Sequence, residues 1–163
     1  MNQTQRVLAI AVVSIAAAVA VVLAAYGPSL SFTKERPSAT ALAIDIEAGL
    51  GAVPLSEISE SARWYSYNSS ESGEVRIFIV KDSSGGTRAA FDACDVCYGA
   101  GKGYAQRGGE MVCRNCGMRF PISGLGELNS GGGCWPSNLN YALRADRIEI
   151  QLADLDAKAW MFD

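Results

Sequence analysis

The sequence predicts a mainly β protein: a small antiparallel β domain with irregular cysteine-bearing loops, preceded by one N-terminal transmembrane helix. Three observations lead to this prediction. A long apolar run lies near the start of the chain, short alternating and β-branched segments follow it, and two Cys-x-x-Cys pairs interrupt those segments. A length of 163 residues is enough for one modest domain and a targeting segment.

The apolar run covers residues 7–26 and reads VLAIAVVSIAAAVAVVLAAY. About 20 such residues cross the hydrocarbon core of a bilayer. Arg6 precedes the run, and because positive residues stay on the cytoplasmic side, we expect the rest of the chain outside. A cleaved signal peptide is the alternative, since the run is rich in alanine. Under either interpretation the main domain is exported. An uncleaved run makes it a single-pass protein of the cell membrane.

Three parts of the chain follow from this. Residues 1–26 form a cytoplasmic stub and anchor, and residues 27–38 form a linker rich in proline, serine and mixed charge. Residues 39–163 form the extracytoplasmic, cysteine-rich domain. Within it, residues 40–46 alternate weakly and are expected to form a strand, which residues 50–54 (LGAVP) break.

The strands that follow are predicted from their composition. A polar turn or short helix at residues 55–62 leads to an aromatic strand, Arg63 to Tyr67. Residues 74–81 (EVRIFIVK) give the strongest strand signal, because they are β-branched and apolar. The turn DSSGG then returns the chain through residues 87–93 to the first cysteine.

The C-terminal part is expected to complete the sheet. Residues 147–152 (RIEIQL) alternate and predict a late strand. After it, Trp160, Met161 and Phe162 are expected to pack on the sheet as part of the core rather than to form a binding surface.

Charge and composition exclude several classes of function. The formal charge is −3 with a pI near 5.0, so no basic character points to nucleic acid. The chain has no histidine, which excludes Ser-His-Asp and Cys-His catalysis, Rieske centres and haem attached through Cys-x-x-Cys-His. Five cysteines remain to carry metal or redox chemistry.

The cysteines follow the pattern Cys94-x2-Cys97-x15-Cys113-x2-Cys116-x17-Cys134. Each Cys-x-x-Cys turn places two sulfurs on one side of a tight loop, and two such loops give four thiolates around one ion. Tetrahedral sulfur coordination suits zinc, a single iron or an iron–sulfur cluster. The first four cysteines are therefore the predicted core of a metal site. Paired disulfides are the structural alternative in an exported protein.

Two glycine-containing elements accompany the cysteines. Gly117 directly follows Cys116 and allows positive φ, so that backbone amides turn toward sulfur. Three glycines precede Cys134, which is a candidate fifth ligand, a replacement for one member of a cysteine pair, a ligand of a second ion, a spare thiol or a disulfide partner. Residues 99–104 (GAGKGY) lack the ending of a phosphate-binding loop and are expected to fold over the metal.

Residues 63–141 resemble the membrane iron–sulfur, FtrD-like proteins. The resemblance rests on an aromatic strand, on both cysteine pairs and on a glycine-rich element around the last cysteine, with Trp135 where asparagine is commoner. These elements are residues 62–67, 91–97 with Gly103-Tyr104, 111–117 and 131–136. The family implies an iron or iron–sulfur centre on the outer face of a membrane, and some relatives occur with ferrous-iron uptake systems, where an electron-transfer role has been proposed.

The predicted function is that of a membrane-anchored metal-binding protein that transfers electrons through an iron or iron–sulfur centre. Its expected partner is a membrane permease or a redox protein. Binding of nucleic acid is not expected. The alternative is a binding module stapled by structural zinc, since a small exported domain gains much stability from such a staple. An enzyme is not expected, because thiol–disulfide oxidoreductases open a helix with their Cys-x-x-Cys, and here the flanking residues predict strand and loop.

Overall fold

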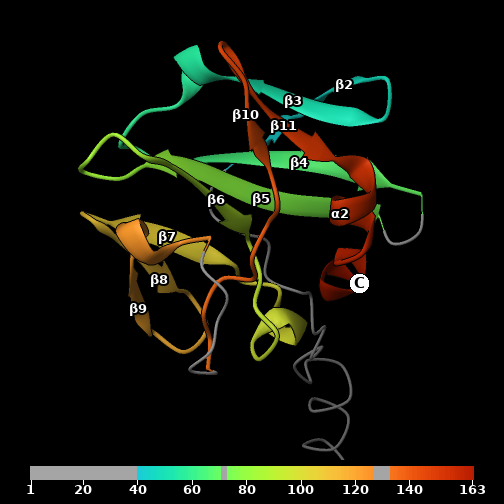
Figure 1. The fold of residues 1–163 in the computed structure, drawn as a ribbon. Helices are drawn as coiled ribbons and strands as arrows, with labels where there is room; N and C mark the ends of the chain where they lie inside the picture. The colour runs from blue at the N-terminus through green and yellow to red at the C-terminus, as the bar shows by residue number, and fades with distance from the viewer. Residues whose placement is uncertain (1–39, 71–72, 127–132) are drawn as a thin grey trace, which may run out of the picture. The chain divides into compact units, whose positions relative to one another are not determined.

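Three small β-sheets form the described part of the molecule (Figure 1). The computed structural model describes residues 40–70, 73–126 and 133–163. The prediction of a mainly β protein with small antiparallel sheets is confirmed. The predicted membrane segment, residues 7–26, and the linker, residues 27–38, lie outside the described residues. Among the helices that the structure does describe, none has the length and apolar character needed to cross a bilayer.

Sheet A contains the strands that the sequence predicts most strongly. Its order is β1 (Leu42–Ala43), β4 (Arg63–Ser69), β5 (Gly73–Lys81) and β6 (Thr87–Phe91). Strands β4, β5 and β6 pair antiparallel, whereas β1 lies parallel to β4. The short turn after β5 therefore brings β6 back along β5 and delivers the chain to the first cysteine.

Strand β5 is buried on both faces, which explains its unbroken apolar sequence. Ile77 and Ile79 point into the core shared with sheet B, and Phe78 and Val80 point into the core that contains the cysteines. We call these the sheet B core and the cysteine core. The sheet B core contains Ile44, Val53, Ile58, Tyr65, Val75, Ile77, Ile79, Ala89, Phe91, Leu139, Ile148, Ile150, Leu155 and Ala159. The cysteine core contains Phe78, Val80, Ala90, Cys94, Tyr104, Met111, Cys113, Phe120, Ile122, Leu125 and Cys134.

Sheet B covers one face of sheet A (Figure 1). Its strand order is β10 (Ala142–Leu143), β11 (Arg147–Gln151), β3 (Leu50–Pro54) and β2 (Asp45–Glu47), and all its pairs are antiparallel. The prediction that residues 50–54 only interrupt strand structure is wrong, because they form β3, which pairs with β2 and β11. Gly51 allows this, since a Cβ there would lie 2.8 Å from Ile44 Cγ2. The η1 turn (Leu55–Glu57) follows β3.

Sheet C carries the second cysteine pair. It consists of β7 (Tyr104–Arg107), β8 (Glu110–Cys113) and β9 (Arg119–Pro121), paired antiparallel in that order and followed by the η3 turn (Ile122–Gly124). The prediction of irregular loops is therefore wrong for this segment. Two glycines join β7 to β8, and Gly108 has φ +58°, as two-residue hairpin turns require.

The chain ends in helix α2 (Leu152–Asp156) and the η4 turn (Ala159–Phe162). Met161 is buried, and Phe162 packs against Phe91 with ring centroids 6.4 Å apart. The expectation of core packing is correct for these two residues. It is wrong for Trp160, which is 45% exposed and contacts Tyr98 in an edge-to-face arrangement at 4.9 Å.

Candidate metal centre

Three separate segments of the chain bring the cysteines together. Cys94 and Cys97 follow β6, with the η2 turn (Tyr98–Ala100) directly after them, and Cys113 is the last residue of β8. The segment after Cys134 runs beside the end of β6, since Phe91 N–H donates to Ser137 O at 3.0 Å and Ser137 N–H donates to Ala93 O at 2.9 Å. This pairing places the last cysteine beside the first.

The sulfur atoms converge, but not in the set that the spacing alone indicates. Cys97, Cys113, Cys116 and Cys134 have sulfurs that all lie within 4.8 Å of one another. Cys94 is not in this group, although its Sγ lies 3.1 Å from Cys134 Sγ. Cys134 is also 3.1 Å from Cys113. The structure thus brings three of the four core cysteines into one group with Cys134, and leaves Cys94 at its border.

The second cysteine turn has the backbone geometry expected of a thiolate loop. Gly117 has φ +76° and its N–H donates to Cys113 O at 2.9 Å, while Cys113 N–H donates to Met118 O at 2.9 Å. The Met118 amide lowers the pKa of Cys116, and desolvation opposes it. The turn therefore stabilises the thiolate form of its most exposed sulfur.

Hydrogen bonds within the first cysteine turn hold its conformation. Tyr98 N–H donates to Cys94 O at 3.1 Å, and Cys97 N–H donates to Cys94 Sγ at 3.1 Å. The Asn115 side chain lowers the pKa of Cys97, whereas burial and the Cys113 charge raise it, and the net direction is upward. The sulfur of Cys97 therefore lies between the two turns and interacts with both.

Aromatic residues surround the segment that carries Cys134. Tyr104 Oη donates to Cys134 O at 2.6 Å. Trp135 packs edge-to-face on Phe120 with centroids 4.9 Å apart and lies against Gly124, where a Cβ would meet the indole at 3.1 Å. Burial raises the pKa of Cys134, and a bound cation would stabilise its thiolate.

A buried carboxylate connects sheet A to sheet C. Asp92 accepts the Tyr104 N–H at 2.8 Å and lies 3.5 Å from Arg76 Nε. Burial raises the pKa of Asp92 to about 6, although the Tyr104 amide and Arg76 act in the opposite direction. Gly103 leaves room for this contact, because a Cβ there would lie 2.5 Å from Asp92 Oδ2. Sequence reasoning missed this residue; its position two places before the first cysteine was the available signal.

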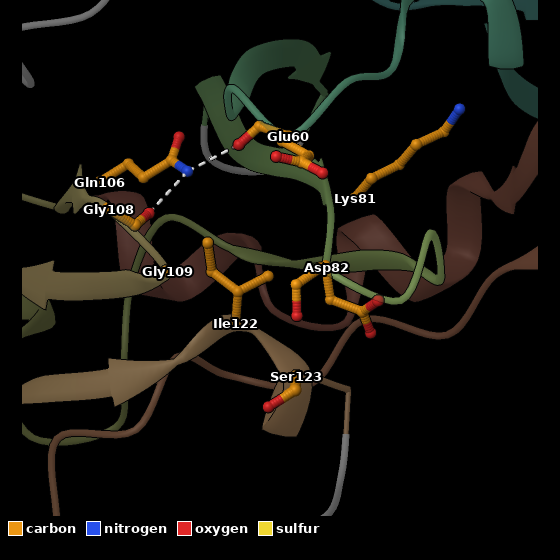
Figure 2. A pocket seen from close by; sticks show the side chains of 9 residues that line it. Glu60, Lys81, Asp82, Gln106, Gly108, Gly109, Ile122 and Ser123 are labelled. Atoms are coloured by element: carbon orange, nitrogen blue, oxygen red, sulfur yellow. Dashed lines mark hydrogen bonds between the residues drawn. The ribbon is translucent and has the colours of Figure 1, made fainter.

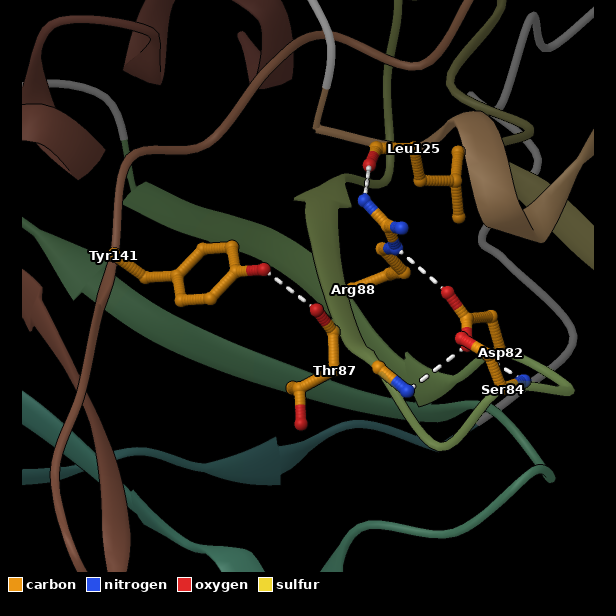
Figure 3. Close-up of polar contacts among 7 residues, drawn as sticks. Asp82, Ser84, Thr87, Arg88, Leu125 and Tyr141 are labelled. Atoms are coloured by element: carbon orange, nitrogen blue, oxygen red, sulfur yellow. Dashed lines mark hydrogen bonds and ion pairs between the residues drawn. The ribbon is translucent and has the colours of Figure 1, made fainter.

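A second polar network links Leu125, just after η3, and Tyr141 to the β5–β6 hairpin, as Figure 3 shows. Asp82 accepts Arg88 Nε at 2.9 Å, and Arg88 Nη1 donates to Leu125 O at 3.4 Å. Tyr141 Oη donates to Thr87 O at 2.6 Å. These contacts link the elements on either side of Cys134 to one turn of sheet A.

A polar pocket of about 250 Å³ lies where sheet C meets the end of β5 (Figure 2). Gln106 lines it, with Nε2 donating to Glu60 O at 2.7 Å and to Gly108 O at 3.0 Å. Gln106 Oε1 also accepts the Ala62 N–H at 2.6 Å. No cysteine lines the pocket, and we interpret these contacts as anchoring the β7–β8 hairpin to sheet A.

The donors fit a metal better than they fit disulfides. None of the five cysteines, all of which lie in the described residues, forms a disulfide. Four sulfurs from two turns and a third segment can surround one point, and thiolate is the donor that zinc and iron prefer in such sites. The described residues offer these four thiols as a group that can hold a metal ion.

Comparison with known proteins agrees with this geometry. Residues 58–162, more than half of the chain, match the family model described as membrane iron–sulfur containing protein FtrD-like. The chain belongs to this family. The match begins before β4 and ends in η4, so it includes all five cysteines, the whole of sheet C and strands β4, β5 and β6 of sheet A. No curated protein and no solved structure matches this FtrD-like chain.

Proposed function

We propose that this FtrD-like protein is an electron-transfer component, anchored in the membrane with its β domain outside, that carries iron on its cysteine thiolates. The observation that carries the proposal is the convergence of four sulfurs within 4.8 Å in a chain of an iron–sulfur family. Thiolate-bound iron exchanges single electrons between its ferrous and ferric states. The protein positions that iron, and catalysis of its own is not expected.

The exposure of the cluster supports electron exchange with a partner. Cys116 is exposed, while Cys113 and Cys134 are buried. Val96, inside the first cysteine turn, is 63% exposed, and Met118, two residues after Cys116, is 51% exposed. Exposed apolar side chains on both turns provide the kind of small contact surface that transient redox complexes use. We propose a membrane permease or redox protein of a ferrous-iron uptake system as the partner.

The experiment is metal and redox analysis of the protein purified without oxygen. Iron bound to the protein, a thiolate-to-iron absorption band and a reversible one-electron change in that band are the expected results. Colourless protein that carries one equivalent of zinc would refute the electron-transfer proposal.

A matched pair of substitutions tests the proposed contact surface. Met118→Glu places a charge beside Cys116, and Leu143→Glu places one on sheet B at nearly the same exposure, 51% against 53%. Both variants should keep their iron. Only Met118→Glu should slow reduction of the protein by native membranes, severalfold; equal rates for the two would contradict this surface.

The zinc-stapled binding module remains the second candidate, favoured by the burial of Cys94, Cys113 and Cys134 within the cysteine core. A metal there would stabilise the packing of sheet C on sheet A. Under this function, Cys116→Ser lowers the unfolding free energy of the zinc protein and no redox transition is found. The spectrum of the native protein decides between the two.

A further inference from the structure

We propose that Cys97, Cys113, Cys116 and Cys134 bind a single metal ion, and that Cys94 is not a ligand but a positioning thiol that donates a hydrogen bond to Cys134. This inference deepens the proposed function and rests on its metal site, but it holds for iron and zinc alike. It departs from the Cys-x-x-Cys spacing, which pairs Cys94 with Cys97, and from the polynuclear cluster that the family description implies.

The spacing of the sulfurs fits one ion. Metal–sulfur bonds of about 2.3 Å in a tetrahedral site place neighbouring sulfurs about 3.8 Å apart. All pairs within the group of four lie within 4.8 Å, and the Cys113–Cys134 pair lies at 3.1 Å. In a polynuclear cluster, thiolates bind different irons, so some of their separations include the iron–iron distance as well. A group this tight leaves no room for bridging sulfide.

The contacts of Cys94 place it outside this group. Its sulfur touches Cys134 at 3.1 Å, yet it is not within 4.8 Å of every other member of the group. Its lone pairs face the Cys97 N–H at 3.1 Å. Tyr104 Oη lies 3.8 Å from Cys134 Sγ, so this sulfur has both a thiol and a hydroxyl beside it.

This arrangement gives Cys94 a defined role. With Cys134 bound to the metal as thiolate, the hydrogen between the two sulfurs belongs to Cys94, and S–H···S donation withdraws charge from the ligand. Hydrogen bonds to a ligand sulfur stabilise the more reduced, more negative state of the centre and raise its reduction potential. The η2 turn and β6, which flank Cys94, fix the donor in place.

Two alanine variants test the ligand set, because Cys94 and Cys134 are equally buried, at 1% and 3% exposure. The full chain is loaded with zinc or with cobalt, and the metal count is read by native mass spectrometry. Cys94→Ala should retain one ion and the four-thiolate cobalt spectrum of the wild type. Cys134→Ala should lose the ion or bind it at least tenfold more weakly. Circular dichroism of both variants, with Cys94→Ser as a second variant, separates loss of a ligand from loss of the fold.

Several results would overturn the proposal. They are two metal ions per chain, acid-labile sulfide in the native protein, or loss of the metal from both folded Cys94 variants. The positioning role has its own measurement on iron-loaded protein: Cys94→Ala should lower the reduction potential, and Cys94→Ser, which keeps a donor, should restore most of it. An unchanged potential in Cys94→Ala would refute the hydrogen bond. A zinc protein with this ligand set would refute only the electron-transfer function.

Discussion

The two faces of sheet A show how one strand can serve two different cores. The face toward sheet B buries aliphatic and aromatic side chains, among them Ile77 and Ile79, and the contacts there are apolar. The face toward sheet C buries Phe78 beside three cysteines and the Arg76–Asp92 pair. The sheet B core has the composition that folds by hydrophobic burial alone. The cysteine core contains groups that are costly to bury without partners, so we infer that its stability depends on metal.

The largest expected effects come from truncating one core side chain on each face of β5 to alanine. Phe78 and Ile79 are adjacent on β5 and both fully buried. Phe78→Ala should cost about 3–5 kcal/mol and Ile79→Ala about 2–5 kcal/mol of unfolding free energy. Urea unfolding with excess zinc and with chelator then measures the stabilisation that the metal adds to each variant.

Only one of these two variants should change the free energy of stabilisation that the metal adds. Phe78 packs on Tyr104 with ring centroids 6.0 Å apart, and Tyr104 holds Cys134 through its hydroxyl. The stabilisation by zinc should therefore be smaller in Phe78→Ala and equal to the wild type in Ile79→Ala. Equal values in the two variants would mean that the faces do not differ in their dependence on metal.

The sequence predicts the face of sheet A that packs on sheet B better than the face that packs on sheet C. Strands β4, β5, β6 and β11 carry β-branched and alternating residues, and these patterns report burial directly. Strand β3 was predicted as a break because glycine and proline have low strand propensity, but Gly51 is needed there for close approach to Ile44. Local propensity does not register a contact that sheet pairing creates.

The cysteine face could be predicted in its residues but not in their arrangement. The spacing identifies five cysteines that do converge. Which four form the tight group depends on the pairing of Ser137 with the end of β6, and that contact joins residues more than 40 positions apart. Sheet C had a readable signal in the Gly108-Gly109 turn between two alternating segments. Trp160 is exposed and packs on Tyr98, a contact between distant parts of the chain that no local pattern reveals.

A smaller effect should separate two glycines with similar backbone angles. Gly103 has φ +64° and Gly108 has φ +58°. Alanine at either position costs about 1–2 kcal/mol for the left-handed conformation. Gly103→Ala should cost about 1–3 kcal/mol more from overpacking, because its Cβ would lie 2.5 Å from Asp92 Oδ2, whereas nothing lies within 4 Å of the Cβ of Gly108→Ala.

Metal affinity distinguishes these glycine variants further. Gly103 O accepts the Arg114 N–H at 3.0 Å, so a shift of Gly103 is transmitted to the second cysteine turn. Competition with a chromophoric zinc chelator should show weaker binding in Gly103→Ala and unchanged binding in Gly108→Ala. The reverse order, in stability or in affinity, would contradict the tight contact between Asp92 and the loop.

The smallest effect concerns Asp82, a buried carboxylate in the turn between β5 and β6. The Ser84 hydroxyl and Arg88 lower the pKa of Asp82 from 3.8 to about 2. The unfolded chain therefore binds the proton first as pH falls, so the stability that ionised Asp82 contributes is present above about pH 3.8 and is lost as pH falls toward 2.

Asp82→Asn lacks this contribution at every pH. The difference in urea midpoint between wild type and Asp82→Asn should be constant from pH 7 to 5 and shrink below pH 4. Protonation of the cysteine ligands affects both proteins equally and cancels in the difference, so a difference that grows on acidification would show that the Asp82–Arg88 contact does not form in solution.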